Sequence, residues 1–154
     1  MASNKHKSIK HSVKVEGKKI PKNIEDPNSY LKKKPVWVFN RCDRTHDKWS
    51  LKKCRNLYEE ILDKLIAFEG MTWAEIMKSS GGRRQGTNNH FIKISGMVKE
   101  AQDRALEISL NEDQLFSLRL DGKKRLYGII QNGKFCVIWY TMEHDICLSN
   151  KKHT

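Results

Sequence analysis

Apolar residues recur along the chain at two different spacings, and this difference separates predicted helices from predicted strands. Between residues 51 and 68 they recur every three or four positions, which makes one apolar helical face. This face consists of Leu51, Cys54, Tyr58, Ile61, Leu62, Leu65 and Phe68. Ser50 is placed to cap the start and Gly70 lies beyond the end, so the pattern predicts one helix between these two residues.

Two further helices are predicted after it. Thr72 and Glu75 have the spacing of a capping box, so a short helix should run from there to about Lys78. Helical spacing returns in the apolar residues from 97 to 108, where Glu100 and Arg104 also form an i,i+4 pair. This spacing predicts a third helix over residues 96–108.

Runs of β-branched and aromatic residues predict four strands. The first is residues 36–39, directly after Pro35. The other three lie within residues 115–140, where Asp121-Gly122 and Asn132-Gly133 mark two turns. The sequence therefore predicts an α+β fold, with a short N-terminal strand, two to three helices, and a three-stranded antiparallel meander packed on the helices.

The faces of this meander follow from its turns, because directly opposed residues share a face and a slip of one residue exchanges the faces. A two-residue turn at Asn132-Gly133 sets Arg125 opposite Tyr140. A three-residue loop over 121–123 sets Arg119 opposite Arg125 and keeps the leucines in the core. We therefore expect Arg119, Arg125, Tyr127 and Tyr140 on one face.

The two opposed arginines are the sharpest functional signal. Like charges directly opposite on a sheet are unfavourable, so an anion should lie nearby. That anion is either a bound phosphate or a carboxylate. In the alternative interpretation both arginines are simply solvated or paired with a nearby Glu or Asp, because surface ion pairs are common. Tyr127 and Tyr140 either stack on nucleic-acid bases or simply cover the sheet.

Charge and composition indicate a polyanionic binding partner. The 154 residues suit one domain, and the formal charge is +12. Residues 1–34 hold ten lysines and three acidic residues, so +7 of this charge lies there. We expect these residues to form a disordered basic arm ahead of a domain at 35–154. No apolar run suggests a membrane span or a secretory signal, which indicates a cytoplasmic protein.

Other candidate residues are scattered. His144 lies between Glu143 and Asp145 and is a candidate general acid, whereas His90 is a weaker candidate for the same cleft. Four cysteines without a CxxC pair suggest free thiols, and it stays open whether Cys42, His46, His144 and Cys147 bind zinc. No nucleotide-binding glycine loop or nucleophile motif is present, so we expect no cofactor and no metal in any catalysis.

The segment LFSLRLDGKKRLYGIIQNGKFCVIWY (115–140), with His144 after it, resembles RelE/ParE-like toxins of bacterial type II toxin–antitoxin systems. More loosely, the similarity extends over residues 35–154, and the helix at 96–108 departs from the minimal family pattern. The resemblance implies an endoribonuclease that cuts mRNA during translation without a metal, the 2′-hydroxyl attacking the adjacent phosphate. Its partners would be a cognate antitoxin protein and mRNA, on or off the ribosome.

The resemblance also assigns roles. Arg119 and Arg125 would bind phosphate and stabilise the transition state, and Tyr127, Tyr140 and His144 would transfer protons or stack on bases. We expect further RNA contacts from the basic residues of two loops, Arg83, Arg84, Lys123 and Lys124. Some family members poison DNA gyrase without cutting RNA, and a basic nucleic-acid-binding module without catalysis is a third interpretation.

Overall fold

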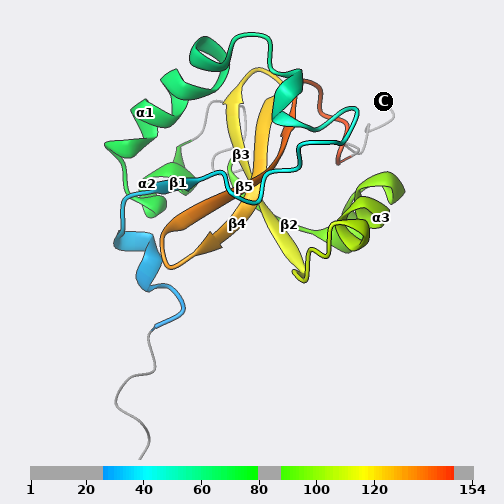
Figure 1. Cartoon of the computed structure of the whole chain (residues 1–154). Helices are drawn as coiled ribbons and strands as arrows, with labels where there is room; N and C mark the ends of the chain where they lie inside the picture. The colour runs from blue at the N-terminus through cyan, green and yellow to red at the C-terminus, as the bar shows by residue number, and fades with distance from the viewer. Residues whose placement is uncertain (1–25, 80–87, 148–154) are drawn as a thin grey trace, which may run out of the picture.

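The computed structural model describes residues 26–79 and 88–147, and a five-stranded mixed sheet forms its centre (Figure 1). The strands lie in the order β1-β5-β4-β3-β2, with β1 parallel to β5 and every other pair antiparallel. Their bounds are β1 (Val36–Val38), β2 (His90–Lys93), β3 (Gln114–Asp121), β4 (Lys124–Gln131) and β5 (Lys134–Thr141). The α+β class is confirmed, but four strands were expected and β2 is the additional one.

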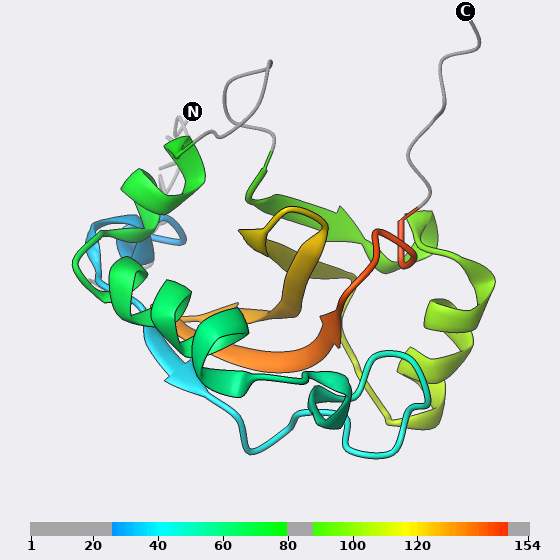
Figure 2. The ribbon, with the colours of Figure 1, turned by 90° about the horizontal axis from the view of Figure 1, so that it is seen from above.

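Helices cover both faces of this sheet. The helices α1 (Asp63–Glu69) and α2 (Trp73–Lys78) lie on one face, and α3 (Lys99–Glu107) lies on the other, as the view from above shows (Figure 2). Strand residues alternate between two buried clusters accordingly. The α1/α2 cluster contains Ile61, Leu65, Trp73, Ile76, Phe116, Leu118, Leu120, Leu126, Phe135, Val137 and Tyr140. The α3 cluster contains Trp49, Met97, Ala101, Ala105, Leu110, Leu115, Tyr127, Ile129, Ile138, Trp139 and Ile146.

The helix expected between Ser50 and Gly70 is broken into three pieces. A 3-10 turn, η2 (Leu51–Lys53), is followed by extended backbone at Cys54, then by a π-helical turn, η3 (Tyr58–Leu62), that leads into α1. Ser50 caps η2 alone, accepting a hydrogen bond from the N–H of Lys52. The apolar spacing was still informative because Leu51 and Cys54 pack against the α1/α2 cluster, but it reported burial and not a continuous helix.

The other two predicted helices are confirmed within a few residues. Thr72 and Glu75 form the expected capping box at the start of α2. Upstream, a 3-10 turn, η1 (Ser29–Lys32), packs on the same cluster, and the carbonyl of Lys33 accepts from the N–H of Trp73. Residues 29–34, which composition placed in the arm, therefore contact the domain.

The turn between β4 and β5 sets the register of the first few pairs. Asn132 and Gly133 both have positive φ, 51° and 87°, as a type I′ turn requires. Ile130 pairs with Phe135 and Gly128 with Val137, as predicted. At Gly128 the strands approach so closely that a Cβ atom would lie 2.3 Å from the carbonyl oxygen of Cys136. Only glycine fits this position.

Beyond Gly128 the predicted register is wrong, because Ile138 is an extra residue that forms a β-bulge in β5. Ile138 and Trp139 both point into the α3 cluster, held there by the N–H of Asp43, which donates to the carbonyl of Ile138, and by Trp139 Nε1, which donates to Asp43. Arg125 therefore lies opposite Thr141. Tyr140 lies opposite Leu126, on the α1/α2 face.

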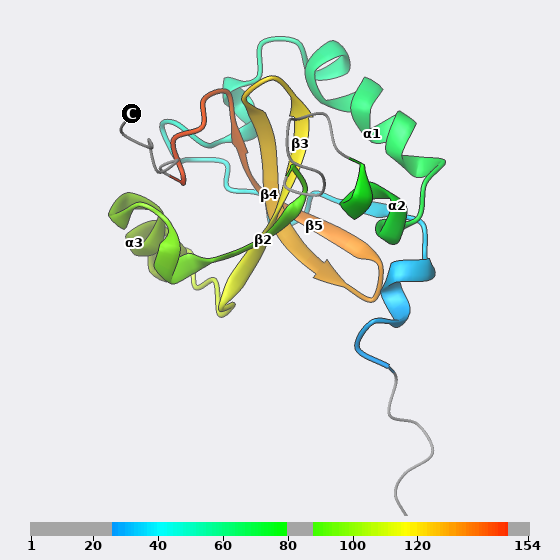
Figure 3. The same cartoon turned by 180° about the vertical axis from the view of Figure 1, so that it is seen from behind.

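β1 and β2 are the two edge strands of the sheet. β2 pairs with β3 at one edge of the sheet and leads toward α3 (Figure 3). Within the described residues, every helix is too short or too polar to cross a membrane.

Candidate functional site

The opposed arginines are confirmed, since Arg119 and Arg125 are direct cross-strand partners in β3 and β4. Arg125 is only 8% exposed, and among the described residues its one hydrogen bond is a long one, from Nη1 to the carbonyl of Lys124 at 3.5 Å. No carboxylate of the described residues forms an ion pair with either arginine. Of the two interpretations of this pair, the structure therefore gives no support to a neighbouring carboxylate.

Burial makes the charge of Arg125 costly. Removal from water lowers the pKa of Arg125, and the nearby charge of Arg119 lowers it further. A guanidinium nevertheless stays protonated in proteins. Arg119 is less buried, and its Nη1 donates to the side-chain oxygen of Asn88 at 3.0 Å. The site thus holds one desolvated cation and one partly solvated cation, side by side.

Three buried hydroxyl groups lie on the same sheet face as these cations and form no hydrogen bond of regular geometry among the described residues, although the Tyr127 hydroxyl interacts with the side chains of Ser117 and Cys147. The three hydroxyl groups belong to Ser117, Tyr127 and Thr141. Thr141 lies opposite Arg125, and Ser117 lies opposite Tyr127 one row further along the same face. A buried hydroxyl without a partner costs about 1–3 kcal/mol, and such groups are few in native proteins. We call Arg119, Arg125, Ser117, Tyr127 and Thr141 the arginine cluster. Its guanidinium and hydroxyl donors suit a ligand with several acceptor oxygens.

Tyr127 is placed as a hydrogen-bond donor within this cluster. It is fully buried, and burial raises its pKa to about 12. The phenol therefore stays protonated at neutral pH. It can donate to an anionic oxygen but is not a base.

Tyr140, expected beside Arg125, lies on the opposite face of the sheet because of the bulge. Its hydroxyl donates to Glu60 Oε2 at 2.5 Å, and Lys124 Nζ lies 3.2 Å from the same oxygen. These contacts, the tyrosine hydrogen bond first, lower the pKa of Glu60 to about 2, while burial and then Glu60 raise the pKa of Tyr140. Tyr140 and Lys124 thus attach the π-helical turn η3 to the sheet, away from the arginine cluster.

His144 is exposed in the segment that follows β5. Its Nδ1 lies 2.9 Å from the carbonyl oxygen of Cys147. A carbonyl only accepts, so Nδ1–H is the donor and Nε2 of the neutral ring is left as an acceptor. Cys147 packs against the α3 cluster. Burial raises the pKa of its thiol, whereas a hydrogen bond from Tyr127 and the charge of Arg125 lower it. The segment therefore folds back beside the arginine cluster.

The acidic neighbours of His144 make other contacts. Glu143 pairs with Lys123 at 2.8 Å, and Asp145 accepts from Trp49 Nε1 at 3.2 Å. Lys123 is thus paired with Glu143, and its side chain is 70% exposed. Arg83 and Arg84, the other two basic residues expected to bind RNA, lie outside the described residues.

The cysteines and His46 have structural surroundings. His46 stacks on Trp49 with ring centroids 4.2 Å apart, and its Nδ1 accepts from the backbone N–H groups of Lys48 and Trp49. All four cysteines are free thiols, as expected. In the part of the chain that the structure describes, no group of three or more His, Cys, Asp or Glu residues is arranged to hold a metal.

The buried ion pair between Asp43 and Arg104 was not predicted. Arg104 donates from Nε and Nη2 to the two carboxylate oxygens, each at 2.8 Å, and Trp139 Nε1 donates to the same carboxylate at 3.0 Å. These hydrogen bonds, led by Arg104, outweigh burial and hold the pKa of Asp43 well below its usual range. Because every Asp43 oxygen is occupied, the pair fastens residues 43–49 to α3 and leaves nothing for a ligand.

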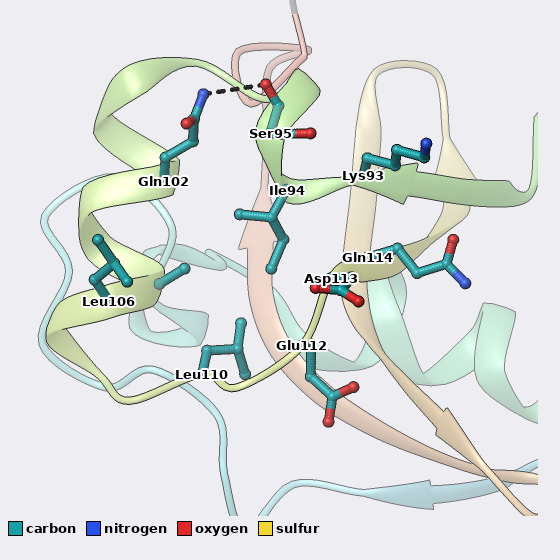
Figure 4. Close-up of a pocket in the computed structure, with 10 residues that line it drawn as sticks. Lys93, Ile94, Ser95, Gln102, Leu106, Leu110, Glu112, Asp113 and Gln114 are labelled. Atoms are coloured by element: carbon teal, nitrogen blue, oxygen red, sulfur yellow. Dashed lines mark hydrogen bonds between the residues drawn. The ribbon is translucent and has the colours of Figure 1, made fainter.

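Two surface hollows bear on the site differently. One of about 330 Å³ is bordered by Arg119 together with Lys64, Asn88 and Asp121, so it lies between α1 and the end of β3 and touches the arginine cluster at Arg119. Another, of about 830 Å³, lies between α3 and the start of β3 (Figure 4). Its lining mixes charges of both signs with apolar residues such as Leu106, and Gln102 already bonds the carbonyl of Ser95. We therefore place the candidate site at the arginine cluster.

Sequence reasoning missed Thr141 as a member of the site because the bulge reversed its predicted face. Ser117 was placed correctly opposite Tyr127, but nothing in the sequence indicates that both hydroxyls are buried.

Comparison with known proteins leaves the chain unassigned: no protein-family model, curated protein or solved structure matches it.

Proposed function

We propose that the protein is a toxin of a type II toxin–antitoxin system that binds the backbone of mRNA in the bacterial cytoplasm and cleaves it as an endoribonuclease. The observation that carries the proposal is Arg125, a buried cation opposite Arg119, with no carboxylate partner among the described residues. A phosphodiester supplies the missing negative charge and acceptor oxygens to which the hydroxyls of Ser117, Tyr127 and Thr141 can donate.

The same arrangement suits phosphoryl transfer. In RNA cleavage the 2′-oxygen attacks phosphorus and the 5′-oxygen leaves, giving a 2′,3′-cyclic phosphate and a 5′-hydroxyl. Negative charge accumulates on the phosphoryl oxygens, where fixed guanidinium groups in a dry site stabilise it most. His144, with Nε2 as its acceptor, takes the proton from the 2′-hydroxyl. The similarity to RelE/ParE-like toxins supports the same chemistry and a cognate antitoxin as partner.

A second candidate, a phosphate-binding RNA module without catalysis, is favoured by the burial of both tyrosines. Tyr127 and Tyr140 were expected to transfer protons or to stack on bases, yet both are buried and burial raises the pKa of each. Both candidates share the arginine cluster and differ only in whether the bound RNA is cut.

Inducible expression in a bacterial host, followed by mapping of RNA ends, tests the proposal. We expect growth arrest and new RNA ends that carry a 5′-hydroxyl, and loss of both in Arg125→Met. Arg55→Met is the matched control, because it removes the same charge from an exposed position outside the cluster. RNA that crosslinks to the protein but stays whole supports the second candidate. Arrest and cleavage that persist in Arg125→Met reject the proposed site.

A further inference from the structure

We propose that His90 is the general acid of this cleavage, an inference that rests on the proposed function. His90 begins β2, the strand that sequence patterns did not predict, and it is the direct cross-strand partner of Ser117. Directly opposed residues share a face, so His90, Ser117 and Tyr127 form one row on the face that carries Arg119 and Arg125. Within this row Ser117 and Tyr127 are buried, whereas His90 is exposed at the rim.

The neighbours of His90 confirm which face it shares. Asn89 points the other way: its side-chain nitrogen donates to the carbonyl of Ile76 at 2.9 Å, on the α2 side. Asn88, the next alternate residue, accepts from the guanidinium of Arg119. Asn88 and His90 therefore stand on either side of Asn89 and share the face of the arginine. Residues related diagonally across a strand pair lie about 7–8 Å apart, which puts His90 within reach of a phosphate held by Arg119.

The positions of the two histidines fit an in-line reaction. The attacking and leaving oxygens stand on opposite sides of phosphorus, so the base and the acid must approach from opposite sides. In the sheet, β3 and β4 carry the arginines and lie between β2 and β5. His90 is on β2, and His144 follows β5. Three strand spacings of about 4.8 Å separate β2 from β5, roughly 14 Å, and side chains from both sides can approach one phosphate across that width.

The proton balance assigns the two roles. His144 donates Nδ1–H to the carbonyl of Cys147, so its Nε2 accepts the proton of the 2′-hydroxyl. As the bond from phosphorus to the 5′-oxygen breaks, that oxygen takes a proton from the imidazolium of His90 and leaves as a hydroxyl. The reaction then ends with His144 protonated and His90 neutral, and exchange with water resets both.

A substrate with sulfur in place of the 5′-bridging oxygen tests this assignment, because a thiolate leaves without a proton. On ordinary RNA we expect His90→Gln to lower the cleavage rate of the purified full chain by about 10²–10⁴-fold, the usual contribution of a general acid. On the sulfur-bridged RNA the same variant should cut within a few-fold of the unaltered protein. His144→Gln should be slow on both substrates, and Lys93→Gln, exposed on the same strand, should be normal on both.

Binding of an uncleavable 2′-deoxy analogue serves as the folding control, and His90→Gln should bind it with unchanged affinity. If His90→Gln cuts ordinary RNA at the normal rate, or stays slow on the sulfur-bridged RNA, His90 is not the acid. If the unaltered protein cuts neither substrate, the proposed function itself fails, which distinguishes the two outcomes.

Discussion

Replacing Arg125 by methionine should make the protein more stable while it removes the proposed function. The methionine keeps most of the apolar stem of the arginine and discards the charge. An unpaired buried ion costs several kcal/mol when it is fully desolvated, and a like charge directly opposite adds roughly 0.2–1 kcal/mol. Arg125 keeps 8% exposure and a long hydrogen bond to Lys124, which offset part of this cost. We therefore expect a net gain of about 1–3 kcal/mol.

Thermal unfolding, followed by tryptophan fluorescence, measures this gain. A domain of this size shifts by roughly 2–4 °C per kcal/mol, so Tm should rise by about 2–12 °C. Arg119→Met is the matched comparison; because Arg119 is partly exposed and bonded to Asn88, its Tm should change by less than about half as much.

Inorganic phosphate provides the second arm of the same experiment. A ligand that binds only the folded protein raises its stability by about 2.7 kcal/mol at a hundred times its Kd, so phosphate should raise the Tm of the unaltered protein. It should leave the Tm of Arg125→Met unchanged. A lower Tm for Arg125→Met, or an equal response of both proteins to phosphate, would refute the view that Arg125 is an unpaired cation held for an anion.

Four other outcomes are expected. Gly128→Ala should lower the free energy of unfolding by about 3 kcal/mol in urea, since its Cβ meets a backbone oxygen at 2.3 Å, whereas Gly96→Ala, with open space around it, should cost little. Asp43→Ala should cost about 3–5 kcal/mol in the same assay, because it breaks a buried ion pair; a loss below 1 kcal/mol would contradict that role. The pKa of Glu60 is lowered from 4.5 to about 2, so its contribution to folding stability is present above pH 4.5 and is lost as the pH falls toward 2. In Glu60→Gln the free energy of unfolding should therefore depend less on pH between 4.5 and 2. The pKa of Tyr127 is raised from 10 to about 12, so its contribution to folding stability is present below pH 10 and is lost as the pH rises toward 12. In an alkaline titration followed by absorbance, Tyr127→Phe should remove one phenol that ionises late.

Turn chemistry and strand alternation were enough to predict the centre of the fold. Asn132-Gly133 gave the correct turn, and the alternation of apolar residues gave the pairing of Arg119 with Arg125. The capping box at Thr72 predicted α2 because it is a local pattern in which both hydrogen bonds lie within four residues. Features of this kind are encoded in short stretches of the chain.

What the sequence did not predict depends on distant partners. β2 is short and lies at the sheet edge, and its existence depends on pairing with β3, more than twenty residues later. The break at Cys54 and the bulge at Ile138 both occur inside regular apolar patterns, and contacts from other segments decide them. Whether a carboxylate pairs with Arg125 depends on the assembled structure, so spacing alone did not decide between a phosphate and solvated or ion-paired arginines.

The bulge at Ile138 also sets how this strand can be compared with any other. Up to Val137, odd and even positions keep the parity that the turn imposes; after Ile138 that parity is reversed. A chain that lacks the extra residue would turn its counterpart of Tyr140 toward the arginines and its counterpart of Thr141 toward α1. One inserted or deleted residue therefore decides whether an aromatic or a hydroxyl side chain lies beside the arginines. Strand residues of two such chains should be matched by sheet face and not by their count from the turn.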